Sequence, residues 1–434
     1  MAMPARRLFR RARPRRGARR ALAGILTLGV AGVAAACGTK PAADPSHTLP
    51  TPSSHQASPR TAHATQGARA AAPRPADPAP AATTSCPAAV LAKMTEAQRI
   101  GQLFLVGLPG NEAGGSVAAT ITSHHYGSAI FGANSTGGVT GARQISDAVQ
   151  ALATGPATAG VRFFVAANQE GGEVQALKGP GISPIPSALA QGTAHVSTLR
   201  KLATVWGDQL RAAGVNLNLA PVMDVVPPGT DAGNAPIGAL QREYGHDPAI
   251  VASHGVAFLN GMASAGVATS AKHFPGLGRV RGNTDFTSSV VDTSTTASAA
   301  YLQTYRAAID SGVPLVMVAL ATYTRIDPHE LAVFSPTIMR GLLRQKLHFR
   351  GTIISDDMGA AAAVAGISAG TRAVDFVAAG GDLITTESLP AADAMDAALL
   401  ARVSSSSSFR AQVNAAVLQV LTTKQKYGLL PCSK

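Results

Sequence analysis

The sequence predicts an α/β protein built around a single (β/α)8 TIM-type barrel. From residue 86 onward, apolar runs of strand length alternate with alanine-rich helical stretches, and this alternation is typical of a parallel sheet with crossover helices. Roughly 350 residues hold eight such units, which favours a closed barrel with generous loops over an open sheet. With 46% hydrophobic residues, the chain has enough apolar side chains for one large core or two ordinary ones.

Residues 1–36 have the features of an export signal. A basic region ends at Arg20, an apolar run of small and aliphatic residues follows, and Cys37 comes next,. The apolar run is shorter than the roughly 20 residues that a membrane-spanning helix needs. The sequence AAAC at 34–37 resembles a bacterial lipobox, in which the cysteine is lipidated and becomes the mature N-terminus. We therefore expect a lipid on Cys37.

Residues 37–85 are predicted to form a disordered tether, because they are rich in Pro, Ala, Ser and Thr and poor in large apolar side chains,. The net charge of +13 lies mostly outside the predicted domain: nine arginines fall within residues 1–20 and the tether adds +2, which leaves +2 for residues 86–434. The net charge of residues 86–434 is so close to zero that polyanion binding is not expected, and we therefore expect no nucleic-acid partner. The expected location is outside the cytoplasm, either anchored to the cell membrane by lipid or extracellular.

Residues 86–434 are predicted to form one catalytic domain. Eight strands are expected at Gln102 to Val106, Ser128 to Phe131, Phe163 to Ala167, Val215 to Ala220, Val267 to Ala271, Leu315 to Ala321, Thr352 to Ile354 and Leu383 to Thr385,. Helices are expected between them, for example at Ser197 to Ala213, Pro248 to Ala265, Ala297 to Ile309 and Pro336 to Lys346. Cys86 and Cys432 lie at the two ends of this domain, and a disulfide between them is the simplest expectation for an exported protein. Two unpaired thiols are the alternative.

The stretch KHFPGLGRVRGNTD, from Lys272 to Asp285, follows a small, apolar strand. Barrel enzymes carry their active sites at the carboxyl ends of the strands, so this loop marks the expected site. It resembles the KHFPGHG segment of glycoside hydrolase family 3, and specifically that of the bacterial β-N-acetylhexosaminidase branch. The resemblance implies a single (β/α)8 barrel and implies that Lys272 and His273 bind sugar.

Further motifs extend the resemblance over about residues 90–390. The family's Ser-Asp motif matches Ser355-Asp356, which implies that Asp356 is the nucleophile, while Asp357 is expected to cap the next helix. NLNLAPVMD at 216–224 and REYGHDP at 242–248 imply that Asp224 shapes the floor of the site and that Arg242 reaches the sugar.

Several positions depart from the family pattern, and two of them bear directly on the site. Asn168 stands where the family has a sugar-binding aspartate, so sugar binding there is expected to persist with a neutral hydrogen bond, which is about half as strong as a charged one. Asp285 stands where relatives have the histidine that protonates the leaving group. We expect the Asp285 carboxyl to do this work, as carboxylic acids do in most glycosidases. Asp292 is the reserve candidate, and loss of catalysis with retained sugar binding is the alternative.

Other motifs are interpreted as structural. Gly366-Ile367-Ser368-Ala369-Gly370 fits the serine-hydrolase pattern, but a helical run rather than a strand precedes it,. His124-His125 and His329-Glu330 lack the helical spacing of zinc sites, so no metal and no cofactor are expected.

These features predict a monomeric, retaining exo-glycosidase that removes terminal β-N-acetylglucosamine from cell-wall fragments or glycoconjugates. Its expected partners are carbohydrate and, through the lipid, a membrane. A β-glucosidase of the same fold and a carbohydrate-binding lipoprotein without turnover remain as alternatives.

Overall fold

The computed structural model describes residues 85–432. The predicted signal, Cys37 and all of the tether except residue 85 lie outside the described residues. Within residues 85–432, no helix combines the length and the apolar character needed to cross a membrane.

Eight parallel strands form the barrel, and each lies within two or three residues of a predicted strand. Their order around the sheet is β12-β9-β7-β6-β3-β2-β1-β13. The backbone N–H of Leu383 donates to the Ile353 carbonyl (3.0 Å) and that of Ser355 to the Leu383 carbonyl (3.0 Å), which joins the two edge strands. The (β/α)8 prediction is therefore confirmed. The barrel strands are β1 (Phe104–Leu108), β2 (Ser128–Phe131), β3 (Phe164–Ala167), β6 (Leu217–Asn218), β7 (Ala268–Phe274), β9 (Leu315–Val318), β12 (Thr352–Ser355) and β13 (Ile384–Thr386).

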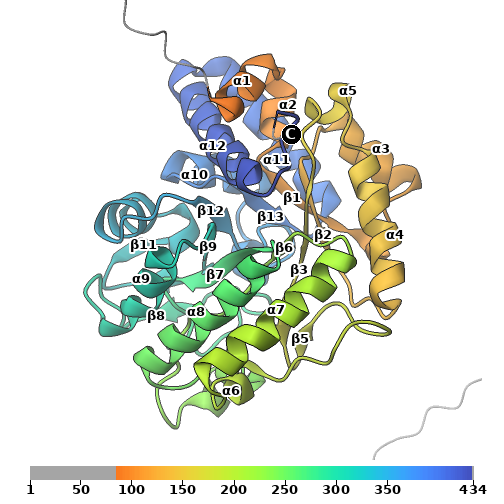
Figure 1. The fold of residues 1–434 in the computed structure, drawn as a ribbon. Helices are drawn as coiled ribbons and strands as arrows, with labels where there is room; N and C mark the ends of the chain where they lie inside the picture. Colours follow the sequence, from red (N-terminus) through yellow and green to blue (C-terminus); the bar gives the residue numbers. More distant parts are fainter. Residues whose placement is uncertain (1–84, 433–434) are drawn as a thin grey trace, which may run out of the picture. The chain divides into compact units, whose positions relative to one another are not determined.

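Helices follow the strands along the chain and cover the outside of the barrel (Figure 1). The α-helices are α1 (Cys86–Lys93), α2 (Glu96–Gly101), α3 (Gly115–Ser123), α4 (Gly138–Ala151), α5 (Gly155–Thr158), α6 (Ala188–Gln191), α7 (Val196–Ala212), α8 (Pro248–Ser264), α9 (Gln303–Asp310), α10 (Ala369–Ala379), α11 (Leu389–Ser405) and α12 (Ser407–Lys426). A π-helix, Thr337–Lys346, takes the place of an α-helix after β9.

Short elements decorate the loops. They comprise the strands β4 (Gln169–Gly171), β5 (Val174–Gln175), β8 (Val291–Asp292), β10 (Thr322–Tyr323) and β11 (Asp327–Leu331), and the 3₁₀ turns Pro109–Asn111, Asp231–Gly233, Gly238–Leu240, Ala300–Leu302, Ala332–Phe334 and Ala362–Val364.

Local sequence explains where these helices begin and end. Asp247 caps α8 by accepting the Ala249 N–H at 2.6 Å, and Pro248 occupies the first turn, where its missing N–H costs nothing,. At α10, Ser368 accepts the Thr371 N–H (3.2 Å) and Gly380 ends the helix with φ of 112°,. Ser368 is thus a helix cap preceded by a 3₁₀ turn, and the serine-hydrolase interpretation is excluded.

The core has two layers, which follow from the alternation of side chains along each strand. Leu105, Phe164 and Leu315 point into the barrel with residues from the other strands. Their neighbours in sequence, such as Phe104 and Val165, pack against the helices,. The interior below the mouth is therefore filled by side chains, and only the carboxyl-terminal end of the barrel offers space for a ligand.

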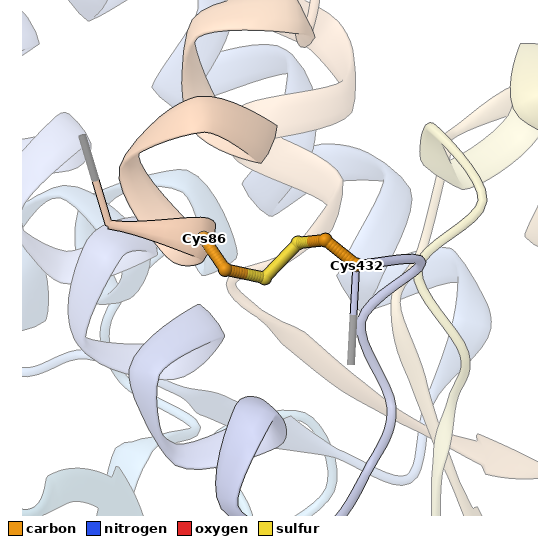
Figure 2. The surroundings of a disulfide bond; sticks show 2 residues. All are labelled: Cys86 and Cys432. Atoms are coloured by element: carbon orange, nitrogen blue, oxygen red, sulfur yellow. A yellow bond between two sulfur atoms is a disulfide. The ribbon is translucent and has the colours of Figure 1, made fainter. Parts of the chain in front are cut away.

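The first and last helices of the domain lie side by side (Figure 1). Figure 2 shows that Cys86, at the start of α1, is joined to Cys432 near the C-terminus by a disulfide. This is the predicted pairing, and it closes a loop of 346 residues.

Candidate active site

A cavity of about 450 Å³ opens at the carboxyl ends of the barrel strands. Six of the seven residues predicted to act in catalysis or sugar binding line it: Asn168, Arg242, Lys272, His273, Asp285 and Asp356. They come from the ends of three strands, β3, β7 and β12, and from two loops that are far apart in sequence. The seventh, Asp224, lies beneath the cavity wall and has no exposed surface.

The floor of the cavity is organised by a buried carboxylate, Glu170, to which the sequence analysis assigned no role. The Arg242 guanidinium donates two parallel hydrogen bonds to Glu170, from Nε to Oε2 and from Nη2 to Oε1, both at 2.8 Å. Lys272 Nζ lies 2.7 Å from Oε1 of the same carboxylate. Glu170 therefore fixes both cations through charge-assisted bonds in one geometry.

This ion cluster stays charged at neutral pH. Burial alone would raise the pKa of Glu170, but Arg242 and Lys272 outweigh it and hold the pKa at about 2,. The cations keep N–H groups for a ligand: Lys272 uses one of its three donors on Glu170 and one on Asn168 Oδ1 (2.9 Å), which leaves one,. Such fixed donors suit the hydroxyl oxygens of a sugar.

Asn168 presents donors rather than acceptors to the cavity. Its Oδ1 accepts the hydrogen bond from Lys272, so the Nδ2 amide N–H groups are left for the ligand,. The neutral hydrogen bond expected at this position is thus one that the Asn168 amide donates to the oxygen of a sugar hydroxyl.

His273 is held from behind by Asp224. The Nδ1–H of His273 donates to Asp224 Oδ2 at 2.8 Å, and Asp224 Oδ1 accepts the N–H of His273 (3.1 Å), the N–H of Leu277 (3.0 Å) and the hydroxyl of Tyr305 (2.8 Å). Burial acts to raise the pKa of Asp224, yet His273 and these donors lower it overall. Asp224 therefore orients His273 and is not placed to touch a ligand.

The strand predicted to end at Ala271 continues through Lys272 and His273 to Phe274. The Met223 N–H donates to the Lys272 carbonyl (2.7 Å), and Phe274 pairs with Val318 of β9. Both sugar-binding candidates consequently lie within a strand and not in a loop, and Lys272 is held by hydrogen bonds to the neighbouring chain segment.

Asp356 follows β12 directly and faces this cationic floor. Its Oδ1 accepts the Asp357 N–H at 2.9 Å, and Oδ2 is left to the cavity as far as the described residues show. Asp357 instead turns back on the chain, where its carboxylate accepts the N–H groups of Gly359 (2.8 Å) and Glu387 (3.0 Å). Asp357 was expected to cap the next helix; it instead caps a turn, because α10 begins only at Ala369 and is capped by Ser368.

Asp285 reaches the same cavity from a docked loop. The Ala362 N–H donates to the Asp285 carbonyl (3.1 Å) and the Ala363 N–H to the Thr284 carbonyl (3.0 Å). Asp285 is exposed at the mouth of the cavity, where partial desolvation and the charge of Asp356 raise its pKa,. A carboxyl with a raised pKa can hold a proton to donate.

Comparison with known proteins agrees with this geometry. The model of the glycosyl hydrolase family 3 N-terminal domain matches residues 95–423. The chain belongs to glycosyl hydrolase family 3. The resemblance inferred from its motifs is thereby confirmed.

Named relatives of this family 3 chain point to one branch. A β-N-acetylhexosaminidase of known structure from Beutenbergia cavernae is 44% identical, with a TM-score of 0.75, over 76% of this chain and 98% of that one. A family 3 β-N-acetylglucosaminidase structure from a Paenibacillus species is 29% identical, with a TM-score of 0.68, over 77% and 63% of the two chains. A β-hexosaminidase of Stenotrophomonas maltophilia is 33% identical over 50% of this chain, and the match spans 63% of that relative's length.

The mouth of this family 3 site is acidic. Glu387, which follows β13, lines the cavity together with Asp285, Asp356 and Asp357. Partial burial and the charges of Asp357, Asp285 and Asp356 raise the pKa of Glu387 to about 7. Sequence reasoning missed Glu387, and the available signal was an acidic residue two positions after a predicted barrel strand. Phe286, 84% exposed, stands beside Asp285 at the rim.

The reserve acid, Asp292, is ruled out by its position. It is buried and does not line the cavity. Its Oδ1 accepts the N–H groups of Ser294 (2.7 Å) and Thr295 (2.8 Å), and its Oδ2 accepts the Thr295 hydroxyl. These bonds occupy both oxygens in a local turn, so Asp292 has a structural role.

Proposed function

We propose that the protein is a retaining exo-β-N-acetylhexosaminidase that removes terminal, non-reducing β-N-acetylglucosamine from cell-wall fragments or glycoconjugates. The observation that carries the proposal is that Asp356 and Asp285 share one cavity above the fixed donors of Arg242 and Lys272. The names of the Beutenbergia and Paenibacillus relatives support N-acetylglucosamine as the sugar.

In the first step, the free oxygen of Asp356 attacks the anomeric carbon and forms a glycosyl ester. The bond from that carbon to the glycosidic oxygen breaks, and the Asp285 proton goes to the leaving oxygen. Donors from Lys272, Arg242 and Asn168 hold the sugar hydroxyls so that the carbon stands in line with the attacking oxygen. In the second step, water gives its proton to Asp285, its oxygen attacks the same carbon, and Asp356 is released.

The charge coupling between the two carboxyls suits this cycle. While Asp356 is an anion, it raises the pKa of Asp285 and keeps the acid protonated. When Asp356 becomes an ester its charge is gone, so the pKa of Asp285 falls and the same carboxyl can accept the proton of water. One residue can thus serve both steps.

We also propose export and attachment to a membrane through a lipid on Cys37, with the domain acting as a monomer. The leader composition and the AAAC sequence at 34–37 support this proposal. Metabolic labelling with a fatty acid tests it, because a Cys37→Ala protein should remain unlabelled and leave the membrane fraction.

A panel of p-nitrophenyl glycosides tests the activity. We expect release of nitrophenol from the β-N-acetylglucosaminide, with the product first appearing as the β anomer in a proton NMR time course. Preference for the β-glucoside would indicate the β-glucosidase alternative, and sugar binding without turnover would indicate a binding protein.

The neighbouring aspartates give an internal control for the nucleophile. Asp356→Asn should abolish turnover and keep the fold, because an amide forms no glycosyl ester. Asp357→Asn should cost much less, since Asp357 accepts backbone N–H groups. Equal losses in two folded variants would show that the nucleophile is wrongly assigned.

A further inference from the structure

A second cluster of ionisable side chains lies in the segment that connects β6 to α8. It consists of Asp231, Glu243 and His246, whose nearest ligand atoms all lie within 4.8 Å of one another. None of the three lines the catalytic cavity. Glu243 directly follows Arg242, so this cluster and the sugar-binding arginine share one stretch of backbone.

Glu243 is the unusual member of the cluster. Its side chain is 0% exposed, and neither carboxylate oxygen has a hydrogen-bond partner among the described residues. Asp231 Oδ1 is likewise buried without a hydrogen-bond partner. Burying an unpaired carboxylate is costly, and buried carboxylates are normally paired, hydrogen-bonded, protonated or bound to a cation. The arginine beside Glu243 does not neutralise it, because Arg242 is committed to Glu170.

We propose that Asp231, Glu243 and His246 bind one divalent cation of the zinc or manganese class. Two carboxylates and a neutral imidazole balance the charge of such an ion. The imidazole ligand favours zinc over magnesium and calcium, and the carboxylate and carbonyl oxygens also suit manganese.

The distances between candidate ligands suit this class. His246 Nδ1 lies 3.6 Å from Asp231 Oδ1 and 3.1 Å from the Val226 carbonyl oxygen. Metal bonds of about 2.1 Å place neighbouring ligand atoms roughly 2.9–3.4 Å apart in octahedral or tetrahedral geometry. With the proton of His246 on Nε2, its Nδ1 and the Val226 carbonyl can both face the ion. The side chains of His246 and Asp231 are 33% and 35% exposed, so they can close around it.

A cation here would tie both ends of the 226–246 segment together. Val226 and Asp231 lie near its start and Glu243 and His246 near its end, with Arg242 immediately before Glu243. The expected effect is a more stable protein and a better fixed Arg242. The three ligands are separated by 11 and 2 residues in sequence, which is why spacing rules predicted no metal.

Isothermal titration of the chelator-treated protein with ZnCl₂, MnCl₂, CaCl₂ and MgCl₂ at neutral pH tests the proposal. We expect one equivalent of zinc or manganese to bind and to raise Tm, and Glu243→Gln and His246→Ala each to weaken binding at least about 30-fold. His246→Ala is a partly exposed position and keeps the test valid if Glu243→Gln fails to fold.

His124→Ala is the matched control, because His124 also lies between two carboxylates, Asp393 (3.5 Å) and Asp396 (3.0 Å). This variant should bind zinc like the wild type. Binding that survives Glu243→Gln and His246→Ala but is lost in Asp356→Asn would place the cation in the catalytic cavity and overturn the proposal. Binding of calcium or magnesium alone would also overturn it. So would binding of no metal, in which case a proton shared between Glu243 and Asp231 would neutralise the cluster.

Discussion

The assignment of Asp285 as the acid makes a graded prediction about leaving groups. A general acid contributes about 10²- to 10⁴-fold to the rate, so Asp285→Ala should lower kcat/KM on an N-acetylglucosamine disaccharide by about 10³-fold, or about 4 kcal/mol of barrier. The leaving sugar oxygen needs a proton as its bond breaks, whereas p-nitrophenolate leaves without one. With the aryl glycoside, formation of the glycosyl ester should therefore slow by roughly tenfold or less.

The second half-reaction provides an independent readout. Hydrolysis of the glycosyl ester requires a base that activates water, and the Asp285→Ala variant lacks this base. Azide needs no base, so it should attack the ester from the face that Asp285 occupied, restore turnover and yield a β-glycosyl azide detectable by mass spectrometry. Ser288→Ala, an exposed position of the same loop, is the control and should behave like the wild type.

Glu387 is the rival acid, since it lines the same cavity. If Asp285→Ala keeps full activity on the disaccharide, or if azide rescues Glu387→Ala and not Asp285→Ala, then the acid is Glu387 and the reasoning from the family position is wrong.

Three further perturbations test other parts of the structure. Asp285→Asn removes a carboxylate whose charge raises the pKa of Glu387, so the titration of the Glu387 carboxyl, followed by carbon NMR, should move to lower pH. An unmoved or raised pKa would contradict the coupling,. Replacing Cys86 and Cys432 together by alanine should lower the unfolding free energy by roughly 2–5 kcal/mol in thermal melts with activity retained, and two free thiols in the oxidised protein would show that no bridge forms,. Burial lowers the pKa of the Lys424 ammonium to about 7, so above pH 7 the unfolded chain binds more protons than the folded chain,. Between pH 7 and 10 the wild type should therefore gain stability relative to Lys424→Met, by at most about 1.4 kcal/mol per pH unit. Parallel melting profiles of the two proteins would refute this.

The barrel could be predicted from the sequence because its signal is local. Each strand is a short apolar run, and each run is buried on both faces in the structure, as in β1 and β9,. Strand ends were less predictable. The continuation of β7 through Lys272 and His273 depends on pairing with β9 and a bridge to Val222, and no pattern within the strand itself specifies those partners.

The candidate site divides in the same way. Asp356 and Lys272 were found through short motifs at strand ends, where sequence and position agree. Glu170 and Glu387 were missed because their roles depend on contacts with residues distant in sequence. Glu170 binds Arg242, which is 72 residues away, and Glu387 lies close to Asp357. Burial converts such contacts into large pKa changes, and burial cannot be assigned residue by residue from one chain.

The aspartate at position 285, where the resemblance implies a histidine in relatives, is consistent with how the 283–285 loop is held. The Asn283 side chain accepts the Asp285 N–H at 3.0 Å, which shapes the turn locally. The carbonyls of Thr284 and Asp285 then accept N–H groups from residues 362 and 363, in the segment that begins at Asp356, the proposed nucleophile. The backbone of the acid is thus bonded to the stretch of chain that also carries the nucleophile. Because this anchoring uses main-chain atoms, it does not depend on whether residue 285 is histidine or aspartate. The chemistry of the proposed acid can therefore change while its place in the cavity that Asp356 also lines is kept.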